Sequence, residues 1–339
     1  MRGVSVGPEA TLTIGIKALN EEAHIAASLA SACAAAAPFG GDVVLADCGS
    51  TDRTIEIAAN YPVRIVQLAD PAQKSCGTGA QLAFQEARGA FFYLLDGDMV
   101  LQPRFLAEGV AFLRANPEYA AVGGLVRQAN TESLEFELRA ETENVHPAGE
   151  VDRLDCGGLY RVEAIRSVGH FADRNLHSFE EYELGVRLRA KGWKLARIEV
   201  DAVEHYGHTT QGYHLILNRL RSGYAGGSGE VVRAALGKPH LAHVLRGFPH
   251  LRKSLIIWAW WLALFPALAT GRMVLAACIF GALLAYFAWR YRGLRLGLYT
   301  MAAWNMHGIG LAQGLLRPRL PVNAPIPRHD LSQGAATKR

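Results

Sequence analysis

The chain has 339 residues, enough for one domain of ordinary size and an additional segment. Its 35 Lys and Arg residues nearly balance 31 Asp and Glu residues, so the net charge of +4 argues against a nucleic-acid-binding protein. Half of the residues are hydrophobic and the mean hydropathy is +0.09, which is high for a wholly soluble enzyme. Because charged residues become rare after Ser254, we predict a soluble α/β part followed by an apolar part.

The first hundred residues alternate between β-rich and helix-rich segments. We predict strands at 11–20, 42–52, 63–69 and 90–98, with helices at 21–37, 53–61 and 79–89. Strands that alternate with helices at this spacing indicate βαβ units and a mainly parallel sheet. In an open sheet of this kind, ligands bind beyond the carboxyl ends of the strands.

Polar residues mark the ends of three of the predicted strands. They are Asn20 and Glu21 after the first strand, Asp47 and Ser50 after the second, and Asp96, Gly97 and Asp98 after the fourth. Each set alone could be a helix cap or a solvated turn. Carboxylates that end a buried strand are costly unless water or a cation compensates their charge. The three sets together therefore predict a ligand site at one edge of the sheet.

Five segments of the chain resemble, in order and spacing, the glycosyltransferases of family 2. They read ALNEE, ADCGSTDRT, LLDGDM, CGGLYRVEAIRSVGHF and FEEYELGVRLRAKGW, and they lie within residues 11–210. The resemblance implies a GT-A fold, a nucleotide-activated sugar as donor, and inversion of the anomeric centre. We expect the catalytic domain to cover residues 1–235.

The resemblance implies a donor site built largely from the polar strand ends. Asp47 would accept a hydrogen bond from a uracil-type N–H, although Cys48 stands where members often carry an acidic residue or Asn. The frequency of donors in the family favours a UDP-sugar, with a GDP-sugar second. Lys74 lies where members often have a basic residue near the phosphates, and it could equally be a solvated lysine. The remaining nucleotide-sugar-binding residues implied are Asn20, Glu21, Ser50, Asp96, Gly97, Arg219 and Arg221.

The resemblance also implies a divalent metal ion, Mn²⁺ or Mg²⁺. Asp98 would be a ligand, with His205 as a further ligand and His208 in reserve. The departing nucleoside diphosphate gathers negative charge, which such an ion would stabilise.

An inverting transfer needs a carboxylate that takes the proton of the acceptor hydroxyl. Position matching assigns this role to Glu181, with Glu180 as the rival, because the family usually has Glu-Asp where this chain has two glutamates. The alternative is that these residues merely favour the positive N-terminus of a helix, with Arg187 paired to Glu183.

Other segments have possible roles around the transferred sugar. Gly157 and Gly158 would form a loop near the donor sugar and acceptor, and residues 132–143 could line the acceptor site. Processive members carry a Gln-x-x-Arg-Trp motif, but no Trp follows Arg219 or Arg221, which indicates transfer of single sugars. These two arginines could contact the diphosphate or simply be solvated.

The C-terminal third predicts attachment to a membrane. Residues 254–271 and 273–289 hold no charge, and each could span about 26 Å as a helix at ~1.5 Å per residue. Buried soluble helices are the alternative. Basic flanks predict a hairpin over 254–289 whose ends face the cytosol, at an inner membrane. We further expect an interfacial basic segment at 236–253, an interfacial or re-entrant segment at 296–316, and a basic tail at 317–339.

We therefore expect an inverting, metal-dependent, non-processive glycosyltransferase. Its acceptor would be a polyprenyl-linked or other lipid-linked glycan, used for a cell-surface polysaccharide or glycolipid. The alternative is a catalytically inactive, membrane-anchored protein that binds nucleotide sugars or acts as a scaffold. A nucleotidyltransferase is disfavoured because no Gly-rich phosphate loop follows the first strand.

Overall fold

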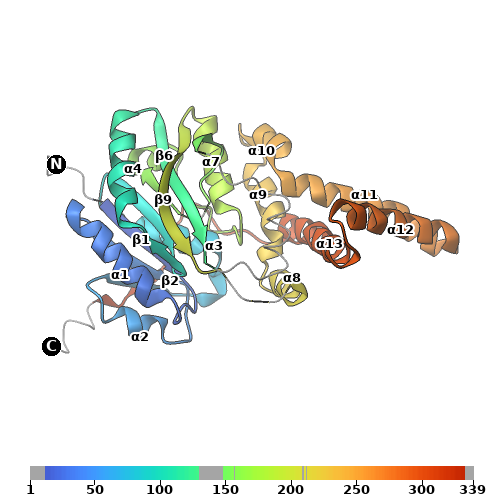
Figure 1. Cartoon of the computed structure of the whole chain (residues 1–339), viewed down its shortest axis with the longest axis horizontal. Helices are drawn as coiled ribbons and strands as arrows, with labels where there is room; N and C mark the ends of the chain where they lie inside the picture. Colours follow the sequence, from blue (N-terminus) through green and yellow to red (C-terminus); the bar gives the residue numbers. More distant parts are fainter. Residues whose placement is uncertain (1–11, 130–147, 156, 208–209, 211, 333–339) are drawn as a thin grey trace.

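The computed structural model describes residues 12–129, 148–155, 157–207, 210 and 212–332. They form a sheet domain from which a helical extension projects (Figure 1). The strands are β1 (Leu12–Ala18), β2 (Asp42–Asp47), β3 (Arg64–Leu68), β4 (Phe91–Asp96), β5 (Met99–Leu101), β6 (Tyr119–Gln128), β7 (Gly149–Val151), β8 (Gly158–Arg161), β9 (Lys194–His205) and β10 (Arg328–Asp330). The helices of the sheet domain are α1 (Ile25–Ala36), α2 (Thr54–Ala58), α3 (Cys76–Gln85), α4 (Pro103–Ala115), α6 (Val162–Ser167) and α7 (Glu180–Ala190).

The first four strands form the parallel part of the sheet, in the order β3-β2-β1-β4. Successive residues of β4 alternate between two hydrophobic clusters, with Tyr93 and Leu95 in one and Phe92 and Leu94 in the other. Helices α1 and α4 contribute to the first cluster, whereas α3, α6 and α7 contribute to the second. Both faces of the sheet are thus covered, which explains the continuous apolar runs of these strands. The predicted α/β fold is confirmed.

Beyond β4 the sheet is mixed. Strand β8 is antiparallel to both β4 and β6, β6 is parallel to β9, and β5 and β9 are antiparallel. Strand β5 begins directly after the turn at Gly97 and Asp98, and its Met99 is paired with His205 of β9. This pairing brings the end of β4 next to the end of β9.

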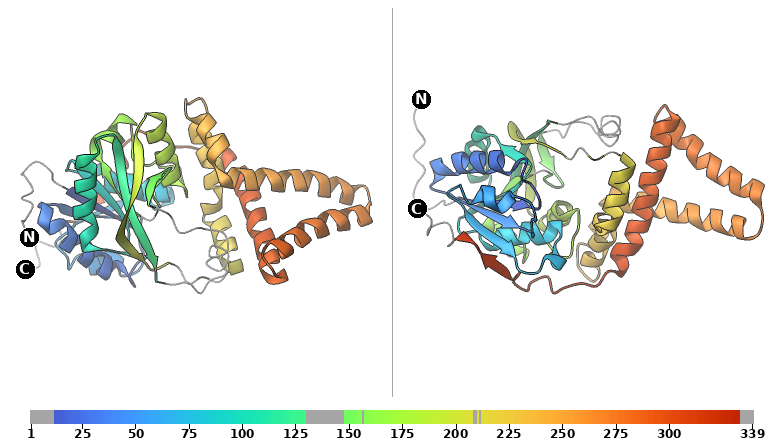
Figure 2. Two further views of the ribbon diagram at one scale, coloured as in Figure 1. Left: turned by 45° about the horizontal axis from the view of Figure 1, so that its top comes forward. Right: turned by 90° about the horizontal axis from the view of Figure 1, so that it is seen from below.

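A second group of helices lies beside the sheet domain. It consists of α8 (Gly212–Arg221), the 3₁₀ turn η3 (Tyr224–Gly226), α9 (Gly227–Ala235), α10 (Leu241–Gly247), α11 (Pro249–Ala269), α12 (Met273–Arg290) and α13 (Leu294–Leu316). Figures 1 and 2 show α11 and α12 extending away from the sheet domain as a hairpin. Helices α11 and α12 are long and apolar enough to cross a membrane.

Helix α13, which contains the third apolar segment, packs closely against the protein. A Cβ atom at Gly310 would lie 2.0 Å from the carbonyl oxygen of Ala225, and one at Gly314 would lie 1.9 Å from that of Gly226. Its polar Asn305 accepts a hydrogen bond of 2.8 Å from the indole of Trp261 in α11. These contacts explain the lower hydrophobicity of this segment, because protein covers much of its surface.

The residues after α13 run back along the sheet domain. Arg317 is ion-paired with Glu230, and Arg319 with Asp173. Strand β10 then pairs antiparallel with β3 at the edge of the sheet (Figure 2). As far as residue 332, the stretch expected to be a basic tail is therefore packed on the sheet domain.

Candidate active site

The polar residues after β1, β2 and β4 lie at one edge of the sheet. Lys17 of β1 is in register with Asp96 of β4, and Ala18 of β1 is in register with Asp47 of β2. Since the three strands are parallel, their carboxyl ends meet, and the loops that follow them are adjacent. The structure therefore brings together the three sets of residues that the sequence singled out.

Asp47 is fully buried, and only one of its two carboxylate oxygens accepts hydrogen bonds. Its Oδ2 accepts hydrogen bonds from the backbone N–H groups of Gly49 and Ser50, at 2.8 and 3.0 Å, and from the amide of Gln67 at 3.0 Å. Its Oδ1 has no hydrogen-bond partner among the residues that the structure describes. A buried acceptor without a partner costs free energy, so this oxygen is suited to accept an N–H from a ligand.

Asn20 and Ser50 tie the loops after β1 and β2 to each other. The backbone N–H of Asn20 donates to Oγ of Ser50 at 2.8 Å, and Asn20 Oδ1 accepts from the backbone N–H of Thr51 at 2.8 Å. Asn20 has a φ of 59°, a left-handed conformation that Asn tolerates better than most residues. Both predicted binding residues thus shape the edge of the site through their side chains.

Gly97 and Glu21 are in close contact at the same edge. A Cβ atom at Gly97 would lie 2.9 Å from Cγ of Glu21 and 3.2 Å from Cβ of Ala18, so the turn between Asp96 and Asp98 has no room for a side chain there. Burial raises the pKa of Glu21 to about 8, and the nearby charges of Asp98 and Asp96 act in the same direction. This edge therefore carries an excess of negative charge, which a cation would relieve.

Asp98 and His205 face each other across the β5–β9 pairing. His205 Nε2 lies 3.3 Å from Asp98 Oδ2, while His205 Nδ1 lies 2.8 Å from Oε1 of Gln128 on β6. A proton on Nδ1 bonded to Gln128 leaves the Nε2 lone pair directed at Asp98, the arrangement of a metal-ligating histidine. The described residues contain no group of three or more His, Cys, Asp or Glu side chains that could hold a metal ion. His208 lies outside the described residues.

Lys17 was not predicted, yet it connects the two halves of the site. Its Nζ lies 2.7 Å from Glu180 Oε1, 3.3 Å from Asp96 Oδ1 and 3.8 Å from Glu181 Oε1. It is the one charged residue of β1, whose other side chains are buried or small. A lysine inside a strand that is covered on both faces needs a buried partner, and this was the signal available in the sequence.

The two candidate bases stand at the start of α7, after Phe179 in a left-handed conformation with φ 66°. Glu180 is 4% exposed and is bonded to Lys17, whereas Glu181 is 20% exposed. Burial raises the pKa of Glu181 to about 8; the charge of Glu180 raises it further and that of Lys17 opposes the shift. Of the two glutamates, Glu181 therefore has the weaker contact with Lys17 and the more exposed carboxylate.

Three further predicted groups border this edge. Lys74 follows the 3₁₀ turn η2 (Pro71–Gln73), close enough to Cys48 to influence its thiol electrostatically. Gly157 has a φ of 92°, and a Cβ there would lie 2.9 Å from the carbonyl oxygen of Leu94. Beside it, Gly158 begins β8 and is paired with Leu94 of β4.

On the side of the helical extension, Arg219 of α8 stacks its guanidinium 5.1 Å above the ring of Tyr224. Arg221 ends α8 with an exposed side chain. The stretch 132–143, expected to line the acceptor site, lies outside the described residues.

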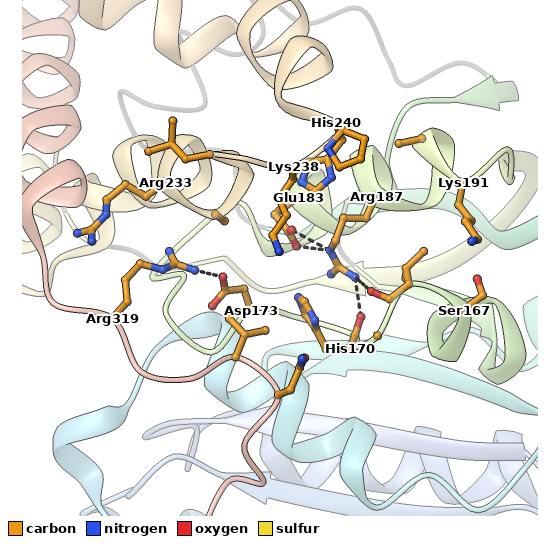
Figure 3. A pocket seen from close by; sticks show the side chains of 18 residues that line it. Ser167, His170, Asp173, Glu183, Arg187, Lys191, Arg233, Lys238, His240 and Arg319 are labelled. Atoms are coloured by element: carbon orange, nitrogen blue, oxygen red, sulfur yellow. Dashed lines mark hydrogen bonds and ion pairs between the residues drawn. The ribbon is translucent and has the colours of Figure 1, made fainter.

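A separate cavity of about 520 Å³ lies between α7, α9 and the segment that contains Arg319 (Figure 3). Its lining includes the Glu183–Arg187 and Asp173–Arg319 ion pairs. None of the predicted site residues lines it, and its carboxylates are already paired with arginines. We therefore place the candidate active site at the strand ends and not in this cavity.

Residues 13–167 match the family model described as Glycosyl transferase family 2. An uncharacterized protein of Mycobacterium tuberculosis is 32% identical over 104 residues, which are 29% of this chain and 30% of that protein. An uncharacterized protein of Mycobacterium bovis matches to the same extent. The chain thus matches less than a third of the length of these relatives.

Solved structures of similar fold cover most of the chain. A mannosyltransferase of Pyrobaculum calidifontis, in complex with GDP-Man and Mn²⁺, has a TM-score of 0.60 at 18% identity, covering 91% of this chain and 88% of that one. TarS residues 1–349 of S. aureus, in complex with UDP-GlcNAc, has a TM-score of 0.53 at 14% identity, covering 89% and 91%. These likenesses show the GT-A fold. The match to the family model supports a glycosyl transferase family 2 assignment for residues 13–167.

Proposed function

We propose that this protein is an inverting, metal-dependent glycosyltransferase that moves a sugar from a nucleotide sugar to a lipid-linked acceptor. One observation carries the proposal. Asp47 with its unpaired buried Oδ1, the Asp98–His205 pair and the carboxylate of Glu181 lie at one edge of the sheet, whose first strands belong to the family 2 match. These groups supply a base-recognition acceptor, candidate metal ligands and a proton acceptor, which are the parts that the reaction requires.

The nucleotide would bind over the loops after β1 and β2. Asp47 Oδ1 would accept the imide N–H of uracil, which makes a UDP-sugar the favoured donor. Asp96 and Gly97 would face the ribose and sugar, and Lys74 would lie near the phosphates. Guanine also presents a ring N–H, and the mannosyltransferase of similar fold holds GDP-Man, so GDP-sugars belong in the same test.

Asp98 and His205 fit a divalent metal ion such as Mn²⁺ or Mg²⁺. A carboxylate oxygen of Asp98 and an imidazole nitrogen of His205 lie 3.3 Å apart, and Gln128 orients the imidazole. When bound, the ion supplies charge stabilisation for the departing diphosphate. With two protein ligands of this kind, the donor's phosphate oxygens and water would complete the coordination.

The transfer itself needs a proton acceptor opposite the leaving group. The acceptor hydroxyl oxygen forms a bond to the anomeric carbon while its proton moves to the carboxylate of Glu181. The bond between the anomeric carbon and the phosphate oxygen breaks, and the nucleoside diphosphate leaves with that electron pair. Glu181 suits this role because its pKa of about 8 lies near the working pH, where proton transfer is most efficient.

The helical extension supports a lipid-linked acceptor. Large apolar side chains of α11 and α12 are exposed, including Leu262 at 77%, Val274 at 81% and Trp289 at 75%. In water such a surface is unfavourable, whereas the acyl chains of a bilayer would cover it. We place the hairpin in an inner membrane with the sheet domain on the cytosolic side, where it would build a cell-surface polysaccharide or glycolipid.

The full chain, purified in detergent with Mn²⁺, is incubated with UDP- and GDP-sugars, with and without a polyprenyl-linked sugar as acceptor. We expect release of nucleoside diphosphate with one donor and little release from Asp98→Ala. Equal rates for wild type and Asp98→Ala would contradict the metal assignment. Thermal stabilisation by a nucleotide sugar without turnover would instead support the inactive binding protein.

A further inference from the structure

We propose that Lys17 is a positioning residue that gives the two adjacent glutamates different roles. It anchors Glu180 and Asp96, and it leaves Glu181 as the carboxylate that receives the acceptor's proton. The inference rests on the proposed function, since it names which residue of that site prepares the base.

The distances around the ammonium group separate the two glutamates. Lys17 Nζ donates a hydrogen bond of 2.7 Å to Glu180 and lies 3.8 Å from Glu181. The first distance is that of a charge-assisted hydrogen bond, and the second exceeds hydrogen-bond length. Glu180 is therefore held by a buried partner, while Glu181 keeps its oxygens available at the more exposed side of the helix start.

Lys17 also determines where α7 begins relative to the sheet. Its backbone lies in β1, in register with Asp96, and the carbonyl oxygen of Lys17 accepts from the N–H of Gly97 at 3.0 Å. The same residue thus fixes the donor-side turn through its backbone and the base-bearing helix through its ammonium. No other described residue makes ion pairs with Asp96, Glu180 and Glu181 together.

The charges of this cluster do not balance. One ammonium against three carboxylates leaves an excess of two negative charges when all four groups are ionised. Three neighbouring groups stay uncharged near neutral pH, because burial raises the pKa of each thiol or phenol: Cys76 of α3, Tyr160 of β8 and Tyr224 of η3. On the donor side, Asp96 also faces the side chains of Asp98 and His205. Burial and then the charges of Asp98 and Asp96 raise the pKa of the nearby Glu21 to about 8. The charge of Glu180 thus raises the pKa of Glu181, and the charge of Lys17 lowers it.

Two single variants test this division of roles. Lys17→Met keeps an unbranched chain of similar length and removes the positive charge, whereas Glu180→Gln is nearly isosteric and removes a negative charge. The pH dependence of kcat/KM for nucleoside diphosphate release is compared with wild type. We expect the acidic limb to move to higher pH in Lys17→Met and to lower pH in Glu180→Gln, each by about one unit. The loss in Lys17→Met should appear in kcat more than in the donor KM.

A merely structural role would not move the two limbs in opposite directions. Limbs that coincide with wild type in both folded variants would overturn the proposal. If Lys17→Met does not fold, the double variant Lys17→Met with Glu180→Gln removes one charge of each sign. We expect it to fold and to have an acidic limb close to that of wild type, and a limb displaced as far as in either single variant would contradict the inference.

Thermal unfolding against pH, without substrate, separates this inference from the proposed function. The folded-state pKa of Glu181 is raised, so its stabilising effect is lost as pH rises through that value. We expect this loss at higher pH in Lys17→Met and at lower pH in Glu180→Gln. If the wild type transfers no sugar but the two variants show these shifts, only the enzyme assignment is contradicted. Unfolding curves of the variants that superimpose on that of wild type would contradict the role of Lys17.

Discussion

Helix α7 carries two groups of acidic side chains, less than one turn apart, that have opposite surroundings. Glu183 receives two hydrogen bonds from Arg187 Nε, at 2.8 and 2.9 Å, and the guanidinium also donates to the backbone carbonyls of His170 and Phe171. Both partners of this pair are buried and fully matched. Glu180 and Glu181 instead share one ammonium, that of Lys17, with Asp96.

The difference separates structural from functional charge on a single helix. The Glu183–Arg187 pair, whose charges compensate each other, holds α7 against the preceding loop and requires no further partner. An under-compensated cluster raises the pKa of a carboxyl group toward neutral pH, and the ionised carboxylate is then a stronger proton acceptor, as a general base requires. Sequence spacing alone suggested both arrangements, because the four acidic and basic positions lie within one short segment.

The largest expected effect is on catalysis by the under-compensated group. Glu181→Gln should lower kcat by about 10²- to 10⁴-fold, the usual contribution of a positioned general base. The donor KM should change little, and above pH 8, where Glu181 is ionised, the melting temperature should stay level or rise, because a poorly compensated charge is removed. Steady-state kinetics and thermal unfolding measure both. A variant with normal kcat would return the role of base to Glu180.

The matched pair should show the reverse pattern. Arg187→Met leaves Glu183 buried without its partner, and breaking such a pair costs about 3–5 kcal/mol of unfolding free energy. Activity per folded molecule should be retained at a temperature where the variant is still folded. The control is the double variant Arg187→Met with Glu183→Leu, which should regain most of the stability. Loss of kcat in a folded Arg187→Met protein would show that the Glu183–Arg187 pair also contributes to catalysis, which would contradict this prediction.

The pH profile gives a smaller but more specific contrast. The base must be ionised to act, so kcat/KM should increase with pH and reach half of its plateau near pH 8, the pKa of Glu181. Glu183→Gln is the matched control, and its limb should coincide with that of wild type in rate assays across neutral pH. A limb centred near the ordinary pKa of a glutamate would show that Glu181 does not titrate as the base.

The smallest expected effect concerns the stability contributed by an exposed ion pair. Arg104 and Glu108 on α4 form an i, i+4 pair at 3.3 Å with an Arg side chain that is 79% exposed. Arg104→Ala should change the free energy of unfolding by less than about 0.5 kcal/mol, because solvent screens such a pair. Chemical unfolding of wild type and variant measures this. A loss comparable to that of Arg187→Met would show that burial does not distinguish these pairs.

Parts of the fold and of the site were predictable from local pattern. Alternating apolar segments predicted β1 to β4 with their helices, and the polar residues at Asp47 and Asp96–Asp98 marked the edge where those strands end. The pairing of His205 with Asp98 needed the antiparallel β5–β9 contact across 107 positions of sequence, which the family resemblance suggested but local periodicity does not encode. The roles of these residues stay predictions until they are tested.

The sequence by itself determined the order of strands and helices, the acidic strand ends and the apolar hairpin, because period, composition and turn residues are local properties. Only the tertiary structure decided that Lys17 reaches across 163 positions to Glu180, that α13 packs its glycines on η3, and that the C-terminal segment returns to β3. Such contacts depend on which surfaces meet after folding. A buried charge requires a partner of opposite charge, and that partner can come from a distant part of the sequence.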